Sequence, residues 1–369
     1  MAAARAEDAP PVTGGEPERG GAPLTVGILV PCRNEAAVIG RKLANLARTI
    51  WPGTDATSHR IVVVDDHSDD GTREQAEELC ERLFAGSPNV EARVVANEVR
   101  PGKPGAVRQG LAALAGVDLI VLTDADVVLG EDALYELERA FRADPRLAMA
   151  CGAPRHVVAV PADGTRPRGA NAESTASPYD RITACVRGVE SRFGALFSVH
   201  GQLLAWRAAL GLRPSFGIAA DDLDLMLQVR SRGCAPSAVR LVPEATFYEA
   251  KPAPGPLADE QALRRARAYV QIARAERHPH GGGASRLQWL AYRRLPLAAP
   301  WLLPLAIVGG LLSLALVAPG PAGSLGALVA LGFVLPPGRR LCRLLALIRR
   351  AGRLERETPV AERWEMARR

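Results

Sequence analysis

The chain has 369 residues with a formal net charge of +6, and 48% of its residues are hydrophobic. Its length predicts a soluble domain of roughly 250 residues together with a further segment. The basic residues form no stripe with interleaved aromatic residues, which argues against a nucleic-acid partner. The six cysteines show no paired or metal-type spacing, so we expect reduced, structural thiols.

The N-terminal part alternates between buried strands and amphipathic helices. Residues 1–22 are rich in Ala, Gly, Pro and Glu and are expected to form a disordered tail. Beyond them, continuous apolar runs predict strands and helical spacing predicts helices. In chain order these are a strand at 24–30, a helix at 35–49, a strand at 60–64, a helix at 70–84, a strand at 90–96, a short helix ending at 115 and a strand ending at Asp124. The alternation predicts an α/β fold with a mostly parallel sheet and helices on both faces.

Polar residues follow three of the predicted strands. Such sheets bind ligands outside the carboxyl ends of their strands, so we expect these residues to meet on one edge. As the alternative, each group caps the helix that follows it. The three groups are Arg33-Asn34-Glu35, Asp65-Asp66 and Asp124-Ala125-Asp126.

The third group and a glycine-flanked lysine favour a site for a metal and a diphosphate. Asp124 and Asp126 end an apolar strand, where ionised carboxylates need a partner, and oxygen ligands at this spacing suit Mg²⁺ or Mn²⁺. Lys103 lies in the sequence PGKPG, where the glycines let the backbone approach a ligand and the ammonium group can meet a phosphate. The alternative for Lys103 is a solvated lysine in a turn.

Two apolar segments near the C-terminus predict a membrane hairpin. Residues 295–317 carry no charge and are long enough for a transmembrane helix. Residues 322–335 are fewer and precede a Pro-Pro-Gly sequence, so this segment either spans or re-enters the membrane. Arginines flank the pair on both sides. The positive-inside rule then places both flanks, and the large N-terminal domain, in the cytoplasm.

The chain resembles the family 2 glycosyltransferases over roughly residues 24–275. Four pieces carry the resemblance: ILVPCRNEAAVIG, VVVDDHSDDGT, PGKPGAVRQG and LTDADVVL. Members of that family are inverting nucleotide-sugar enzymes with the GT-A fold, a Rossmann-like α/β sheet. The resemblance implies that Asp65 or Asp66 binds the nucleobase, that Lys103 lies near the nucleotide, and that Asp124 binds ribose or metal. It also implies that Asp126 binds the metal, and that the residues around the first strand end contact the donor, namely Pro31, Arg33, Asn34 and Glu35.

By the same resemblance, the segment from Ser198 to Arg207 lies under the donor sugar. Gly201 and Gln202 in this segment are therefore expected to contact substrate. His200 either touches substrate or is a structural histidine.

An acidic pair further on is similar to the family's motif that ends in the catalytic base. Asp221 and Asp222 stand at the predicted start of a helix, and Asp222 falls on the position of the base. There the helix dipole favours the ionised form that a base requires. The alternative is that one of the two carboxylates is the helix N-cap.

The sequence Gln261-Ala-Leu-Arg264-Arg265 is similar to a Gln-x-x-Arg-Trp motif found in processive members of the family. Arg265 stands where those members have the tryptophan that stacks on the acceptor. This difference argues against a polysaccharide synthase. We therefore expect a single transfer to a lipid or lipid-linked acceptor.

The function predicted from the sequence is an inverting transfer of sugar from a nucleotide-sugar, most commonly a UDP-sugar in this family, at the cytoplasmic face of the plasma membrane. One alternative is a nucleotidyltransferase, although residues 31–35 are not the glycine-rich phosphate loop that such enzymes carry. A second alternative is a catalytically inactive membrane scaffold. The expected organisation is a tail (1–22), a catalytic domain (23–280) with a donor half (23–130) and an acceptor half (131–280), a membrane hairpin with a basic segment (281–350), and a cytoplasmic tail (351–369).

Overall fold

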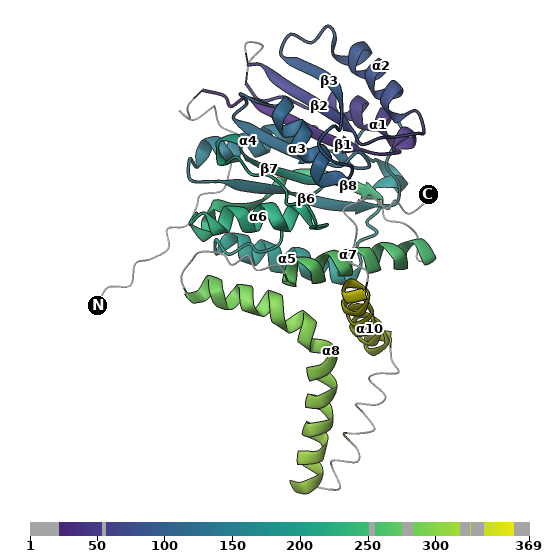
Figure 1. The fold of residues 1–369 in the computed structure, drawn as a ribbon, viewed down its shortest axis with the longest axis vertical. Coiled ribbons are helices and arrows are strands. Elements are labelled where there is room, and N and C mark those ends of the chain that lie inside the picture. The colour runs from purple at the N-terminus through teal and green to yellow at the C-terminus, as the bar shows by residue number, and fades with distance from the viewer. Residues whose placement is uncertain are drawn as a thin grey trace, which may run out of the picture.

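The computed structural model describes residues 22–53, 57–250, 255–274, 283–317, 325 and 336–357. Within this part of the chain an eight-stranded sheet forms the centre of the molecule (Figure 1). Across the sheet the strands are β3 (Val90–Ala96), β2 (His59–Asp65), β1 (Val26–Cys32), β4 (Leu119–Thr123), β7 (Leu203–Arg207), β6 (Met149–Val157), β8 (Val239–Ala250) and β5 (Val128–Leu129).

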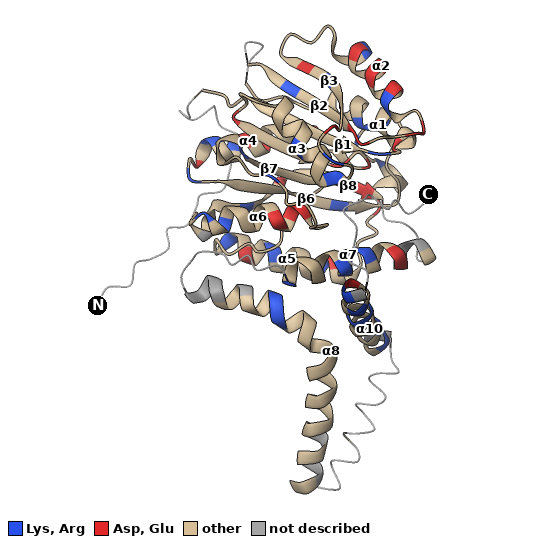
Figure 2. Cartoon of the chain, in the orientation of Figure 1, with Lys and Arg blue, Asp and Glu red and all other residues tan. Residues whose placement is uncertain are grey.

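The N-terminal half of the sheet is parallel, as its sequence predicts. Strands β3, β2, β1 and β4 pair in parallel, and Cys32 at the end of β1 lies opposite Asp65 at the end of β2. All residues of β1 and β4 are buried, and neither strand carries a charged residue (Figure 2). Continuous apolar runs of this kind suit strands covered on both faces. Since the strands are parallel, their polar carboxyl ends share one edge of the sheet.

The C-terminal half of the sheet is mixed. Strand β7 runs antiparallel to both β4 and β6, and β5 runs antiparallel to β8, whereas β6 and β8 are parallel. Because β7 is reversed, Leu203 pairs with Thr123 at the polar edge, and Arg207 pairs with Leu119 at the opposite end. The predicted α/β architecture is thus confirmed, with antiparallel pairs beyond β4.

Four helices form the lower part of the molecule in Figure 1: α5 (Pro178–Arg192), α7 (Pro256–Arg274), α8 (Gly283–Val317) and α10 (Pro336–Glu357). Helix α8 bends and its second half projects away from the sheet; the helix contains Pro296, Pro300 and Pro304, and proline is a usual cause of such bends (Figure 1). Helix α10 extends past residue 350, where a tail was expected to begin, and packs against α7 through Arg267 and Glu355 at 3.4 Å.

Within the described residues, no helix combines the length and the apolar character that crossing a membrane requires. The predicted transmembrane hairpin is therefore not found in this part of the chain. Its second segment, 322–335, lies outside the described residues apart from Leu325.

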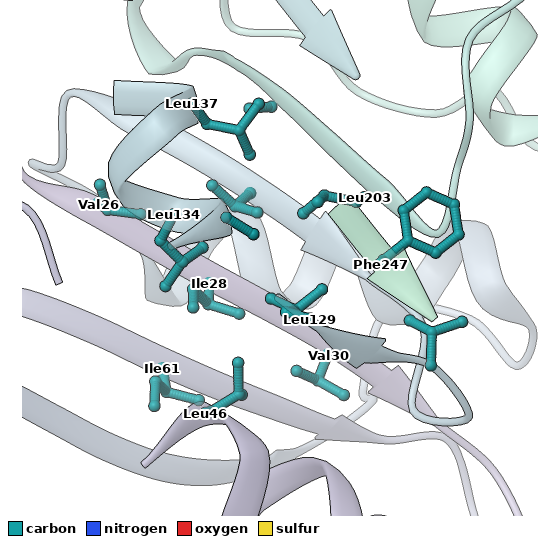
Figure 3. Close-up of a cluster of buried hydrophobic side chains, with 14 of the residues drawn as sticks. Val26, Ile28, Val30, Leu46, Ile61, Leu129, Leu134, Leu137, Leu203 and Phe247 are labelled. Carbon is teal, nitrogen blue, oxygen red and sulfur yellow. The ribbon is translucent and has the colours of Figure 1, made fainter. Parts of the chain in front are cut away.

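Two apolar clusters, one on each face of the sheet, hold the helices in place. On one face α1 (Ala36–Leu46), α2 (Thr72–Phe84) and α4 (Ala133–Ala143) pack on alternate residues of the strands. Figure 3 shows this cluster, in which Ile28 of β1 lies between Leu134 of α4 and Leu46 of α1, and Val30 lies beside Leu129. On the other face α3 (Lys103–Ala113) and α6 (Asp221–Ser231) pack on the intervening residues. The sheet is thus a rigid base for the loops at its polar edge.

Candidate active site

Hydrogen bonds join the loop after β1 to the loop after β2. The backbone N–H of Asn34 donates to Ser68 Oγ at 2.9 Å, and the N–H of Asp69 donates to Asn34 Oδ1 at 3.0 Å. The N–H of Glu35 donates to Thr72 Oγ1 at 2.8 Å. Asn34 adopts a left-handed backbone (φ 53°) and does not cap α1, whose N-cap position is Glu35 and lacks a side-chain cap. Asn34 therefore shapes the edge of the site.

Asp66 is a structural residue, although it lies at the strand end where a base-binding carboxylate was expected. It is fully buried, and its carboxylate accepts from Asn97 Nδ2 at 2.6 Å and from the N–H of Gly102 at 2.8 Å. Arg33 Nη1 lies 3.8 Å from the same carboxylate. Asp66 thus fastens the loop before Lys103. Sequence reasoning missed Asn97, whose only signal is its position directly after β3.

Asp65 is the member of the pair whose carboxylate is only partly satisfied by the described residues. Its Oδ2 accepts from the N–H of Ser68 at 3.3 Å. Its Oδ1 is buried and has no hydrogen-bond partner among the described residues. A buried oxygen of this kind is costly unless a donor reaches it, and a nucleobase N–H would be such a donor. Pro31, also expected near the base, pairs with Val64 inside the sheet.

Lys103 is not a solvated lysine. It is the first residue of α3, and its Nζ lies 2.9 Å from Asp124 Oδ1 and 3.3 Å from Asp221 Oδ2. Burial alone would lower the pKa of Lys103, but the carboxylates of Asp124 and Asp221 raise it well above its ordinary value. The lysine therefore stays charged and holds two acidic segments together. The turn before it is close-packed, because a Cβ on Gly105 would lie 1.8 Å from Arg100 O.

Asp124 and Asp126 do not cap a helix. The next helix, α4, begins at Ala133, and its N-cap position is Asp132. Asp124 points to Lys103 at the end of β4, and the backbone carbonyl of Asp126 accepts from Arg41 Nη2 at 3.0 Å. The described residues contain no group of three or more side chains that could hold a metal by themselves. The pair suits Mg²⁺ or Mn²⁺, which commonly take one or two protein carboxylates and complete their shell with substrate phosphates and water.

Asp222 has the properties of a general base. It lies in the first turn of α6, whose N-cap position is Ala220, so neither acidic residue is the N-cap. Burial, and then the charge of Asp221, raise the pKa of Asp222 to about 6, while the N–H of Leu223 at 2.8 Å and the charge of Lys103 oppose this rise. A pKa near the working pH favours general-base catalysis.

Gly201 leaves the space that Asp222 occupies. A Cβ at position 201 would lie 3.2 Å from Asp222 Cβ and 3.4 Å from its Oδ2. The backbone carbonyl of the next residue, Gln202, accepts from Thr123 Oγ1 at 2.8 Å. Gly201 and Gln202 therefore contact Asp222 of α6 and Thr123 of β4, respectively. Arg207, in contrast, lies at the far end of the antiparallel β7, where its guanidinium binds the carbonyl of Phe141. Its expected place under the donor sugar is wrong.

His200 is neutral and contacts a neighbouring helix. Its Nε2 lies 3.0 Å from Arg187 Nη1 of α5, and Arg187 Nη2 donates to Ser198 Oγ at 3.0 Å. Burial, followed by the charges of Arg187 and His156, lowers the pKa of His200 to about 3. These neighbours fit the structural role that was one of its two alternatives.

The Gln261-Arg264-Arg265 sequence lies on α7. Arg265 Nη2 lies 3.5 Å from Glu249 Oε1 of β8. The same glutamate lies 3.7 Å from His156 Nδ1. Gln261 is half-buried and Arg264 exposed. Arg265 therefore joins His156 of β6 and Glu249 of β8 in a second cluster of charged and titratable side chains.

The fold and the edge of polar residues together define an α/β protein with a carboxylate-rich site beside the carboxyl ends of its parallel strands. Residues 27–198 match the profile of glycosyl transferase family 2, and residues 119–335 match that of glycosyl transferase family group 2. The second match covers more than half of the chain. The chain belongs to the family 2 glycosyltransferases with the GT-A fold.

A solved structure and two sets of curated proteins are similar to the chain. The mannosyltransferase PcManGT from Pyrobaculum calidifontis, in complex with GDP-Man and Mn²⁺, is 25% identical with a TM-score of 0.67, over 93% of this chain and 91% of that one. The poly-beta-1,6-N-acetyl-D-glucosamine synthase of Staphylococcus epidermidis is 23% identical over 48% of this chain and 38% of its own length. That of Staphylococcus aureus (strain COL) is 28% identical over 34% of this chain and 28% of its own length. The chain thus spans well under half of these curated relatives.

These similarities agree with the geometry of the edge. The family membership makes the chain a glycosyltransferase, and the similar mannosyltransferase structure contains a nucleotide-sugar. Family membership favours sugar transfer over the alternative of a nucleotidyltransferase.

Proposed function

We propose that the chain transfers the sugar of a nucleotide-sugar to a lipid or lipid-linked acceptor, in one displacement that inverts the anomeric carbon. The observation that carries this proposal is the position of Lys103, which contacts Asp124 and Asp221 with one ammonium group. Asp124 belongs to the donor side, and Asp221 adjoins the base Asp222. The reacting carbon would therefore lie between a diphosphate and a single base, which is the arrangement for direct displacement.

On the donor side, Asp65 would accept a hydrogen bond from the nucleobase through its unpartnered Oδ1. Asp124 and Asp126 would hold a divalent cation, Mg²⁺ or Mn²⁺, which offsets the charge on the departing diphosphate. Lys103 adds a fixed positive charge at the same place. UDP-sugars are the commonest family donors, whereas the similar mannosyltransferase structure contains GDP-Man with Mn²⁺, so both nucleotides are candidates.

On the acceptor side, Asp222 would take the proton of the attacking hydroxyl. The acceptor oxygen forms a bond to the anomeric carbon while the bond from that carbon to the diphosphate oxygen breaks. The proton passes to a carboxylate oxygen of Asp222, and the nucleoside diphosphate leaves. The raised pKa of this residue supports the role, because a stronger base accepts the proton more readily.

The surface of α5 supports a lipid as the acceptor. The helix directs polar side chains inward, where Asp180, Arg187 and Glu190 contact other parts of the protein. Its exposed side chains include Arg181 and Arg192. Beside them, a row of apolar side chains is between 44% and 82% exposed, namely Tyr179, Ile182, Val186, Val189 and the C-cap residue Phe193. We call these five residues the α5 stripe. An exposed apolar stripe of this size is typical of a surface that binds a partner or a membrane.

Helices α8 and α10 extend the same kind of surface. Exposed apolar side chains continue along α8, including Leu295, Leu305 and Leu316. The projecting half of this helix carries no charged residue, whereas α10 is rich in arginine (Figure 2). Apolar side chains beside exposed arginines suit the headgroup region of an anionic bilayer. We therefore propose that the enzyme works at the cytoplasmic face of the plasma membrane.

The proposal can be tested with two radiolabelled donors. The purified protein would be incubated with UDP-glucose or with GDP-mannose, in the presence of Mn²⁺ and a bacterial lipid extract. We expect one donor to yield a labelled lipid whose glycosidic bond has the opposite anomeric configuration to that of the donor. A product with retained configuration would contradict the single displacement. Label found only in water-soluble products would contradict the lipid acceptor.

A further inference from the structure

A buried lysine lies beneath the turn that carries Asp124 and Asp126. Lys42 of α1 is fully buried, and its Nζ donates to Thr123 Oγ1 at 2.7 Å and to the carbonyl of Val127 at 3.2 Å. These two acceptors stand immediately before and after the acidic turn. Lysine is almost never fully buried unless its ammonium group is paired, so the position of its Nζ calls for an explanation.

Neighbours of Lys42 on the same helix bind the same segment. Arg41 Nη2 donates to the carbonyl of Asp126 at 3.0 Å. Asn45, also buried, donates from Nδ2 to the carbonyl of Leu129 at 3.0 Å and accepts at Oδ1 from its N–H at 2.8 Å. One helix therefore holds residues 123–129 by hydrogen bonds at several points. Within this set, Lys42 is the residue that spans the acidic turn.

A second link runs from Lys42 toward the base. Thr123 Oγ1, which accepts from Lys42, donates in turn to the carbonyl of Gln202 at 2.8 Å. The preceding residue, Gly201, lies against Asp222. Both hydrogen bonds can form at once, because a hydroxyl group such as that of Thr123 can accept one hydrogen bond and donate another. The lysine is thus two hydrogen bonds away from the segment that borders Asp222.

We propose that Lys42 is a positioning residue, which fixes the turn of Asp124 and Asp126 for the donor diphosphate and aligns it with the segment beside Asp222. This inference rests on the proposed roles of these carboxylates. Residues that orient metal-binding side chains from behind typically change affinity by about 10 to 100-fold when they are replaced. A lysine that only filled the core would affect stability alone.

The substitution Lys42→Met keeps an unbranched side chain that is one atom shorter, and it removes the hydrogen-bond donors. Calorimetric titration with UDP and with GDP, with and without Mn²⁺, would measure binding without any acceptor. We expect Mn²⁺-dependent binding to weaken by about tenfold or more. The matched control is Asn45→Leu, which removes two buried hydrogen bonds from the same helix but lies further from the carboxylates. This control should lower Tm and leave nucleotide affinity within about twofold, as expected for an effect on folding alone.

A second pair of variants covers the case in which Lys42→Met does not fold. Thr123→Val removes the hydroxyl that links Lys42 to Gln202, and Thr123→Ser retains it. We expect the valine variant to lose nucleotide affinity and kcat, and the serine variant to recover both. If Lys42→Met or Thr123→Val bound nucleotide and Mn²⁺ as the unmodified protein does, the inference would be overturned and the proposed function would stand. If the unmodified protein bound neither UDP nor GDP, the inference about Lys42 and the proposed function would both be overturned.

Discussion

The carboxylate of Asp222 should set the acidic limit of the activity. Its pKa is raised from an ordinary value near 3.8 to about 6, and only the ionised form can accept a proton. As the pH falls through about 6, kcat/KM should therefore decrease, approaching a tenfold loss per pH unit. Asp222→Asn should lower kcat by about 10² to 10⁴ and leave nucleotide affinity nearly unchanged. The measurements are a pH profile of kcat/KM and a nucleotide titration.

Asp224 provides a control for this prediction on the same helix. It is fully buried and accepts from the N–H of Ser215 at 2.7 Å and from Gln228 Nε2 at 3.0 Å. Asp224→Asn should lower Tm but leave the acidic limit of the folded enzyme in place. An Asp222→Asn enzyme with full activity would show that another group is the base.

The charge of Lys103 should influence the base as well as the donor. Its ammonium group lowers the pKa of Asp222, in opposition to burial and Asp221. Lys103→Gln removes this charge, so the acidic limit of kcat/KM should move to higher pH, and the affinity for nucleoside diphosphate should fall. The pH profile and a diphosphate titration would measure the two effects. An unchanged acidic limit would mean that Lys103 acts on the donor alone.

At the scale of the elements, the segment before β7 controls the room around Asp222. Gly201→Ala would place a Cβ 3.2 Å from Asp222 Cβ, closer than most real contacts, so the carboxylate would have to shift. We expect kcat to fall and nucleotide affinity to change little, because the residues proposed to bind the nucleobase and the diphosphate lie on other segments. Gly188→Ala of α5 is the control, since a Cβ there meets nothing within 4 Å. Equal kinetics for the two variants would argue against a constraint at Gly201.

The parallel half of the sheet could be predicted because its strands are buried on both faces. An uninterrupted apolar run such as that of β1, in a chain where such runs alternate with amphipathic helices, is typical of a strand covered on both faces. The direction of β7 could not be predicted in this way. An apolar strand has the same pattern in either direction. Arg207 was placed under the donor sugar by the family resemblance alone, and the antiparallel direction of β7 puts it at the opposite end of the strand.

The polar edge was also predicted, but the roles of its members were not separated. Asp65 and Asp66 are adjacent in sequence, and only packing distinguishes the carboxylate with an unpartnered oxygen from the one that fastens the next loop. Lys42 was missed because lysine is usually exposed. A signal did exist, since Lys42 lies one helical turn from both Val38 and Leu46 on the apolar face of α1.

At the scale of the whole molecule, the active edge and the apolar surface are joined by one helix. Arg187 of α5 faces inward to His200, one residue before Gly201 and thus near the base. The α5 stripe lies on the opposite side of the same helix. An acceptor whose lipid part rests on this surface would need only a short path to reach Asp222. This arrangement makes the lipid proposal testable apart from the chemistry.

The α5 stripe should therefore bind lipid vesicles independently of the donor. In sedimentation with vesicles of phosphatidylcholine and phosphatidylglycerol, we expect Ile182→Glu and Val189→Glu to reduce binding, because each places a charge among exposed apolar side chains. Higher salt should weaken binding further by screening the arginines of α10. Ile50→Glu is the control, since Ile50 is 54% exposed and lies outside the stripe. Nucleotide binding should be unchanged in all three variants, because the stripe faces away from the polar edge; equal sedimentation of the stripe and control variants would exclude α5 from the lipid surface.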